Sequence, residues 1–283
     1  MTLKGRVFHF VSRFVGKITG RYYFEDYERV YPEDMRFDKL GRQMNPTQAD
    51  INNFKNHGKF YLFAGQFVKD KRVADVGCGS GYGSEVLKNC GAGEICGTDI
   101  SRHAIRFASS RFGHLAKFTE QKITDMSRYE DSHFDVVICS EVLEHLKEYR
   151  MEEAAVAEMK RITRQGGVLI IGTPNSEMLP DHGFSFEEIQ SLMDHNFDRY
   201  VIFENALIPF KERKEFWRKR LEQGKTGVII SENINLKETV LLESDGTPEL
   251  KQGIEPGIYD FEGLQIDTTL LHNTHSWGIL AIN

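Results

Sequence analysis

Short apolar runs alternate with stretches of helical periodicity from about Arg72 onward. The apolar runs predict strands at Val73–Val76, Glu94–Asp99, Ala116–Thr119, Phe134–Cys139 and Val168–Gly172. The intervening stretches predict helices at Ser84–Asn89, Ser101–Arg111, Val142–Glu148 and Met151–Thr163. Buried strands that alternate with helices are typical of a parallel sheet that is covered on both faces.

The C-terminal part of the chain is expected to complete this sheet. A helix is predicted at Phe186–His195, and strands are predicted at Tyr200–Leu207 and Ser276–Asn283. About 65 residues separate these two strands, which is too long for a plain connection. We therefore expect an α/β domain over residues 69–283, doubly wound and mostly parallel with an antiparallel last strand. Residues 208–272 would form a cap inserted before that strand.

Residues 1–68 are expected to form an N-terminal helical extension and a linker. Residues 1–21 carry five basic side chains and no acid, with apolar residues at helical spacing. Such a basic amphipathic helix can touch a membrane surface peripherally, although covering its own domain is the favoured interpretation. A second helix is predicted at Asp50–Val68.

Composition narrows the functional classes. The 283 residues include 36 Lys and Arg against 42 Asp and Glu, so the net charge is −6. This balance argues against a general nucleic-acid binder. No run of 18 apolar residues predicts a transmembrane span. The four cysteines follow no zinc or disulfide spacing and no signal peptide precedes them, so we expect a cytoplasmic protein.

A glycine-rich turn follows the first predicted strand. It reads Asp75-Val76-Gly77-Cys78-Gly79-Ser80-Gly81. Closely spaced glycines let the backbone approach a ligand, and the next helix directs its positive end toward that ligand. The dinucleotide pattern G-x-G-x-x-G is not met, because its third glycine would fall on Tyr82 or Ser84. The carboxylate of Asp75 would repel a pyrophosphate but suits a cation such as the ammonium of a methionine moiety.

From about Arg72 to Gly172 the sequence resembles the class I S-adenosylmethionine-dependent methyltransferases, whose first motif is an acid followed by G-x-G-x-G. The resemblance implies a Rossmann-like fold and S-adenosyl-L-methionine as cofactor. Gly77, Gly79 and Gly81 would pass under the methionine part, and Asp75 would anchor its amino group through this loop. Asp99, 22 residues after Gly77, would bind the ribose hydroxyls. Ile100 would pack on the adenine, and Asp125 matches the position that contacts its amino group. The implied cofactor-binding set is Asp75, Gly77, Cys78, Gly79, Gly81, Asp99, Ile100, Asp125, Met126 and Ser140.

A carboxylate–histidine cluster follows the fourth predicted strand. Glu141, Glu144 and His145 have the i, i+3, i+4 spacing of one helical face. Two carboxylates and an imidazole can hold a divalent cation. This E-x-x-E-H motif, followed by Thr173-Pro174-Asn175 and by Asp181-His182 with Phe184, resembles the small-RNA 2′-O-methyltransferases. That resemblance implies magnesium or manganese held by Glu141, Glu144, His145 and His182.

Two other interpretations of the cluster remain open. Glutamates are also favoured at a helix N-terminus, and His182 could simply cap a loop. The expected catalytic residues are Glu144, His145 and His182. Without a metal, His145 or His182 could still act as general base. The E-x-x-E-H half of the motif also occurs in ubiquinone-pathway O-methyltransferases.

Resemblance to methyltransferases of bacterial polysaccharide pathways suggests a sugar hydroxyl as acceptor, in a glycan or a nucleotide-sugar. It is carried by Arg29–Glu33, by His57 with Tyr61, and by Phe184–Phe186. A basic segment with interleaved aromatics, Lys211–Arg220, keeps an RNA acceptor open, although the net charge argues against it. Small catechols or quinones are another alternative, and a non-enzymatic interaction module that keeps the cofactor fold is the last.

Overall fold

The computed structural model describes residues 57–147, 149–176, 183–205, 229–232, 238–242, 248–252, 258–261, 264–267 and 276–283. The predicted N-terminal helix of residues 1–21, the linker that follows it, His182 and the basic segment Lys211–Arg220 lie outside these ranges.

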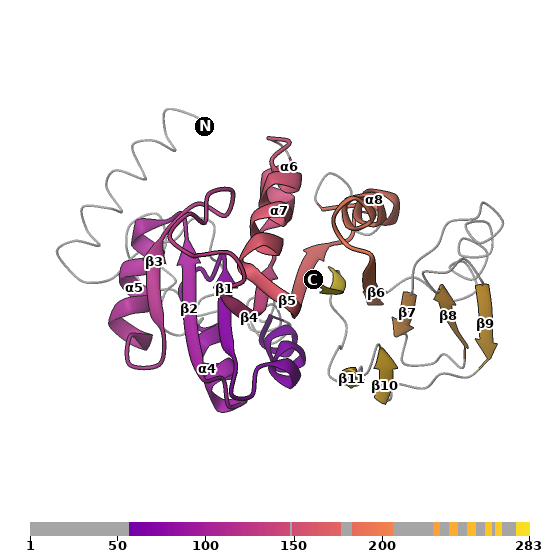
Figure 1. Ribbon diagram of the computed structural model, residues 1–283, viewed down its shortest axis with the longest axis horizontal. Helices are drawn as coiled ribbons and strands as arrows, with labels where there is room; N and C mark the ends of the chain where they lie inside the picture. The colour runs from indigo at the N-terminus through magenta and orange to yellow at the C-terminus, as the bar shows by residue number, and fades with distance from the viewer. Residues whose placement is uncertain are drawn as a thin grey trace, which may run out of the picture.

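An eight-stranded sheet organises the described chain, in the order β3-β2-β1-β4-β5-β12-β6-β7 (Figure 1). Its strands are β1 (Arg72–Val76), β2 (Glu94–Asp99), β3 (Lys117–Glu120), β4 (Phe134–Ser140), β5 (Thr163–Pro174), β6 (Arg199–Asn205), β7 (Ile229–Glu232) and β12 (Ser276–Ile282). The first five strands run parallel to one another, whereas β12 is antiparallel to both β5 and β6. The predicted α/β fold class is confirmed, including its antiparallel last strand.

Helices cover both faces of the sheet. Their bounds are α4 (Gly83–Asn89), α5 (Arg102–Phe112), α6 (Leu143–Lys147), α7 (Glu152–Ile162) and α8 (Phe186–Asn196); residues 57–64 are also helical and continue into the 3-10 turn η1 (Gly65–Phe67). One apolar cluster joins residues 57–64, α4 and α5 to the sheet, and a second joins α7 and α8 to it. Neighbouring residues of a strand contribute to different clusters: in β4, Val136 belongs to the first cluster and Val137 to the second. This alternation explains why the parallel strands are apolar throughout.

Side-chain caps explain where two of the helices begin. The Ser101 hydroxyl accepts the Ala104 N–H, so α5 begins one residue after the serine. Ser185 and Glu188 form a reciprocal capping box at the start of α8. β5 is longer than predicted at both ends, because its residues pair with β4 from Thr163 and with β12 as far as Pro174.

The helix of residues 57–64 lies in the core of the sheet domain. Phe63 and Ala64 are fully buried, and Phe60 and Tyr61 join the same cluster as the strand residue Val73. The structure therefore places the end of the predicted N-terminal extension against the sheet.

The segment before β12 extends the far edge of the sheet. β7 pairs in parallel with β6. β8 (Glu238–Leu242) with β9 (Pro248–Gln252), and β10 (Ile258–Phe261) with β11 (Leu264–Asp267), form two antiparallel pairs. In Figure 1, β7, β8 and β9 lie beyond β6, on the side away from β3, whereas β10 and β11 lie below β6. The expected cover over a functional site stays a prediction.

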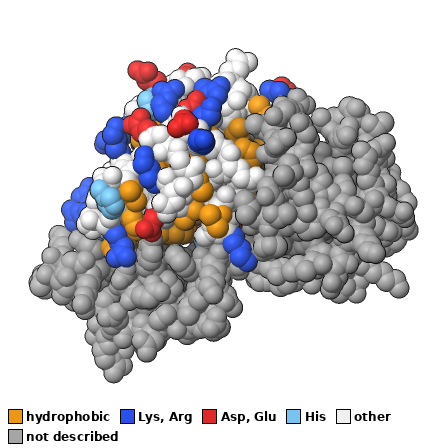
Figure 2. Space-filling model, turned by 90° about the horizontal axis from the view of Figure 1, so that it is seen from below, with side chains coloured by type: hydrophobic (Ala, Val, Ile, Leu, Met, Phe, Trp, Pro, Cys, Tyr) orange, Lys and Arg blue, Asp and Glu red, His pale blue; other side chains and the backbone are white. Residues whose placement is uncertain are grey.

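The apolar length of the helices and the distribution of surface charge are relevant to membrane and nucleic-acid partners. Across the described ranges no helix is long and apolar enough to cross a bilayer. On the described part of the face in Figure 2, Lys and Arg side chains are interspersed with Asp and Glu side chains.

Two adjacent substitutions test the packing of the helix at residues 57–64. Phe63→Ala should lower the free energy of unfolding by about 3–5 kcal/mol, because it leaves a cavity in the core. Leu62→Ala, whose side chain is 46% exposed, should change it by less than about 0.5 kcal/mol. Urea denaturation measures both, and equal effects would contradict the packing described here.

Candidate functional site

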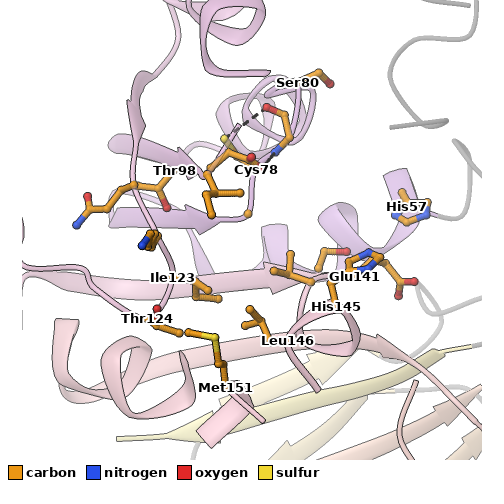
Figure 3. Close-up of a pocket in the computed structure, with 18 of the residues that line it drawn as sticks. His57, Cys78, Ser80, Thr98, Ile123, Thr124, Glu141, His145, Leu146 and Met151 are labelled. Carbon is orange, nitrogen blue, oxygen red and sulfur yellow. Dashed lines mark hydrogen bonds between the residues drawn. The ribbon is translucent and has the colours of Figure 1, made fainter. Parts of the chain in front are cut away.

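A cavity of about 670 Å³ opens at the carboxyl ends of β1, β2 and β4 (Figure 3). Chain order in the sheet reverses between β1 and β4, and open α/β sheets bind ligands at such a reversal. The lining comes from three sources: the loop after β1, the segments that follow β2, β3 and β4, and the helix of residues 57–64. None of the described strands β7–β11 contributes to it.

The glycine loop after β1 is held against the end of β2. The Gly77 and Cys78 N–H groups donate to the Thr98 carbonyl at 2.7 and 2.9 Å. Gly77 has a φ of +76°, and a Cβ there would lie 2.3 Å from a methyl carbon of Val142. Gly81 has a φ of +81°, with a similar clash against Ala108. Only glycine therefore satisfies both the conformation and the space at these two positions.

Asp99 at the end of β2 joins the loop to the next helix. Its Oδ2 accepts the Gly79 N–H at 3.0 Å and its Oδ1 accepts the Ser101 N–H at 2.7 Å. The carboxylate is buried and lines the cavity. Because these bonds fix its orientation, it presents a preorganised acceptor for hydroxyl groups in the cavity.

Asp75 is buried within β1, just before the loop. Its Oδ1 accepts the Tyr61 hydroxyl at 2.9 Å, whereas its Oδ2 has no hydrogen-bond partner among the described residues. Burial raises the pKa of Asp75 to about 7; the Tyr61 hydrogen bond opposes this rise and the Asp99 charge adds to it. Asp75 does not itself line the cavity, whereas Tyr61 and the glycine loop beside it do. Its negative charge therefore suits a cationic ligand group, such as the ammonium of a methionine moiety, that lies across this lining rather than in direct contact with the carboxylate.

The segments that follow β2 and β3 also line the cavity. Ile100 is 67% exposed and lies in this lining. It is joined by Gln121, Lys122, Ile123 and Thr124. The sequence analysis missed these four residues, although their position directly after a strand of the same sheet edge was the available signal.

Two predicted adenine contacts are corrected. Asp125 is exposed, lies outside the lining of the large cavity and borders a smaller neighbouring hollow. Its Oδ1 accepts the Ser127 N–H, because a turn closed by the Asp125 N–H and the Lys122 carbonyl directs it outward. Met126 is fully buried in the core and also does not line the cavity.

The carboxylate–histidine cluster lies beside the loop after β4. Ser140, Glu141 and His145 line the cavity. The prediction that Glu141 shares a helical face with Glu144 is wrong, because α6 begins only at Leu143. Glu141 has a φ of +55°, and its N–H donates to the Gly172 carbonyl, so it still belongs to the end of the sheet.

Glu144 and His145 form a pair in which one member is buried and the other accessible. The Glu144 side chain is 1% exposed and accepts the Thr173 hydroxyl at 3.1 Å. Its Oε1 lies 3.7 Å from Nε2 of His145, whose side chain is 56% exposed. The imidazole is therefore the member of the pair that a ligand in the cavity can reach.

The predicted metal ligands do not converge within the described residues. These residues contain no group of three or more His, Cys, Asp or Glu side chains that could hold a metal ion, so Glu141, Glu144 and His145 do not supply a site by themselves. His182 lies outside the described ranges. The metal set stays a prediction.

A family model described as "Methyltransferase domain" matches residues 74–171. That range contains the glycine loop, Asp99 and the Glu144–His145 pair. Residues 74–171 therefore carry a class I S-adenosylmethionine-dependent methyltransferase domain.

Curated relatives match a similar share of the chain. "Ubiquinone biosynthesis O-methyltransferase" from Thiobacillus denitrificans is 32% identical over 108 residues, which are 37% of this chain and 45% of that protein. The protein of the same name from Ralstonia nicotianae is 35% identical over 106 residues, 36% of this chain and 43% of its own. "Probable S-adenosylmethionine-dependent methyltransferase" from Mycobacterium tuberculosis is 28% identical over 128 residues, 44% of each chain. The chain spans less than half the length of these curated relatives.

The methyltransferase cavity also has an aromatic and apolar rim that the sequence analysis missed. Tyr82, Leu146, Tyr149 and Met151 belong to its lining. Tyr149 and Met151 are exposed large side chains, and they lie in the loop between α6 and α7. The periodicity of apolar residues predicts only whether a residue belongs to the core or to a loop. It therefore does not predict that these four side chains line a cavity.

Paired aspartate substitutions test the cofactor assignment. Asp99→Asn should weaken S-adenosylhomocysteine binding about 10- to 100-fold, because it removes a charged acceptor worth about 1.5–3 kcal/mol. Asp125→Asn should leave the affinity unchanged, since Asp125 lies outside the large cavity. Isothermal titration calorimetry measures both affinities. Equal losses would contradict the cavity assignment, and an unchanged affinity for Asp99→Asn would remove the ribose role.

Proposed function

We propose that this protein transfers a methyl group from S-adenosylmethionine to a hydroxyl oxygen of a small-molecule acceptor. The observation that carries the proposal is the shared lining of one cavity by the Gly77–Gly79 loop, Asp99 and His145. When bound, the cofactor supplies an electrophilic methyl group on a positively charged sulfur. The remaining chemistry is the activation and placement of the acceptor oxygen.

The two ends of the cavity suit different parts of the reaction. In Figure 3, His57, Glu141 and His145 lie at one end, whereas Ile123, Thr124 and Met151 lie at the other. Asp99 and Ile100 would bind the ribose and adenine of the cofactor. An acceptor near His57 and His145 would then lie at the methionine end, where the methyl group is transferred.

His145 is the proposed general base. A neutral hydroxyl is a poor nucleophile, so its proton must leave as the oxygen–carbon bond forms. The accessible imidazole of His145 would take that proton, and the ring would then be stabilised by the Glu144 carboxylate at 3.7 Å. Thr173 donates to the other oxygen of Glu144 and thereby fixes its orientation. Glu144 is thus a positioning residue for the base.

A phenolic hydroxyl of a catechol or reduced quinone fits this machinery best. A phenol ionises near pH 10, so an imidazole can assist its deprotonation without a strongly polarising ion. Two of the relatives are named as ubiquinone biosynthesis O-methyltransferases. The exposed Tyr149 and Met151 also give the cavity rim an apolar character suited to a ring.

A sugar hydroxyl, as the sequence analysis expected, is the second candidate. Its support is that His57 and Tyr61, which carry the resemblance to polysaccharide enzymes, both line the cavity. A sugar hydroxyl is much less acidic than a phenol, so this acceptor would profit more from the predicted divalent cation. The described residues do not supply three ligands for that cation, and the proposed proton transfer therefore uses His145.

An acceptor screen tests this proposal. Purified protein with labelled S-adenosylmethionine should methylate a dihydroxyphenyl compound faster than nucleotide-sugars, oligosaccharides or short RNA. Turnover should survive EDTA within about twofold, because the base is an imidazole. Faster transfer to a sugar, with loss in EDTA and recovery in magnesium, would favour the second candidate and the predicted metal set. No turnover on any hydroxyl would contradict the proposal.

Two histidine variants test the base. His145→Ala should lower the rate of methyl transfer about 10²- to 10⁴-fold, the usual contribution of a positioned base. Its affinity for S-adenosylhomocysteine should stay within about twofold. His195→Ala is the matched control: His195 is also paired with a glutamate, Glu153 at 3.4 Å, but does not line the cavity. Full activity of His145→Ala would exclude it as the base.

A further inference from the structure

Among the described residues, no positively charged group is found to act on Asp75. The titratable groups around it are Tyr61 from the helix of residues 57–64, Cys78 and Tyr82 from the glycine loop and its end, Asp99 from β2 and Cys139 from β4. Each of them is neutral or anionic. An ionised carboxylate here costs free energy until a cation approaches.

Tyr61 connects this carboxylate to the cavity. Its hydroxyl donates to Oδ1 of Asp75, and its side chain also belongs to the cavity lining. The ring is tightly held, because a Cβ on Gly83 would lie 2.3 Å from Cε1 of Tyr61, and because Tyr82 packs edge-on at 5.4 Å. Tyr61 precedes residues 74–171, the range that the family model matches. The contact is therefore contributed by a part of the chain outside that match.

We propose that Tyr61 is a positioning residue that keeps Asp75 ready to ionise, so that cofactor binding expels the Asp75 proton. The hydroxyl holds one carboxylate oxygen of Asp75, and the second oxygen has no hydrogen-bond partner among the described residues. Asp75 itself does not line the cavity, so the ammonium of the methionine moiety would act on its charge across Tyr61 and the glycine loop, which do line it. The inference rests on the proposed function, because it requires S-adenosylmethionine as the ligand.

Proton release from Asp75 should make the ligand affinity depend on pH. In the ligand-free protein the pKa of Asp75 is about 7, so the carboxyl is mostly protonated at pH 6. A bound ammonium lowers that pKa, and each ligand bound at pH 6 should then release close to one proton. Below pH 7 the affinity should fall about tenfold for each pH unit, and above pH 7 it should level off.

Calorimetry with S-adenosylhomocysteine tests this coupling. Titrations of the full chain between pH 5.5 and 8, in buffers of different ionisation enthalpy, report both the affinity and the protons released. Tyr61→Phe keeps the ring against Gly83 but removes the hydrogen bond that lowers the pKa of Asp75. The pH at which the affinity levels off should therefore rise by about one unit, with about fivefold weaker binding at pH 7. Asp75→Asn should bind weakly and release no proton.

Tyr200→Phe is the matched control, because it removes another buried tyrosine hydrogen bond, to Asp194, away from the cavity. It should keep the wild-type profile, and thermal unfolding verifies that each variant is folded. The inference would be overturned if the wild-type affinity did not depend on pH and no proton were released. It would also be overturned if the Tyr61→Phe profile were identical to that of the wild type. Neither result would contradict the proposed function. Failure of the wild type to bind S-adenosylhomocysteine at any pH would instead overturn the proposed function.

Discussion

The two hydrogen bonds that Asp99 accepts from backbone N–H groups hold the site together. They join the glycine loop after β1 to the first turn of α5, so that two segments far apart in sequence share one carboxylate. The positive φ values of Gly77 and Gly81 are needed to bring the loop to this position. Since the same carboxylate lines the cavity, the residue that shapes the loop is also the one proposed to accept hydrogen bonds from the ligand.

The site combines two buried acids with opposite roles. Asp99 is satisfied by backbone donors before any ligand arrives, whereas Asp75 keeps an oxygen without a hydrogen-bond partner among the described residues. Glu144 resembles Asp99 in this respect, because the Thr173 hydroxyl orients it toward His145. Preorganised acids place their neighbours at little cost, while an unsatisfied acid makes ligand binding depend on charge.

Sequence periodicity predicted the sheet well because each buried strand is apolar on both faces, and β2 begins and ends at the predicted residues. The glycine motif likewise located Asp75 and Asp99 beside the loop, since short local spacing sets their positions; of the two, Asp99 lines the cavity. The position of Glu141 could not be predicted from its spacing. Its N–H donates to the Gly172 carbonyl of β5, and α6 begins only at Leu143, so Glu141 lies before the helix. Asp125 and Met126 were misplaced by a tight turn that sequence periodicity does not detect. The contribution of Tyr61 depends on tertiary packing, which local patterns do not encode.

The central position of β12 has a consequence for how the sheet assembles. β12 lies between β5 and β6, yet residues 206–275 separate it from β6 along the chain. During synthesis, the five parallel strands β1–β5 can pair early. β6 contacts them only through β12, so it can join the sheet only after residues 276–282 have been synthesised. Assembly on the ribosome would thus proceed in two stages, with the edge of β5 exposed during the interval between them.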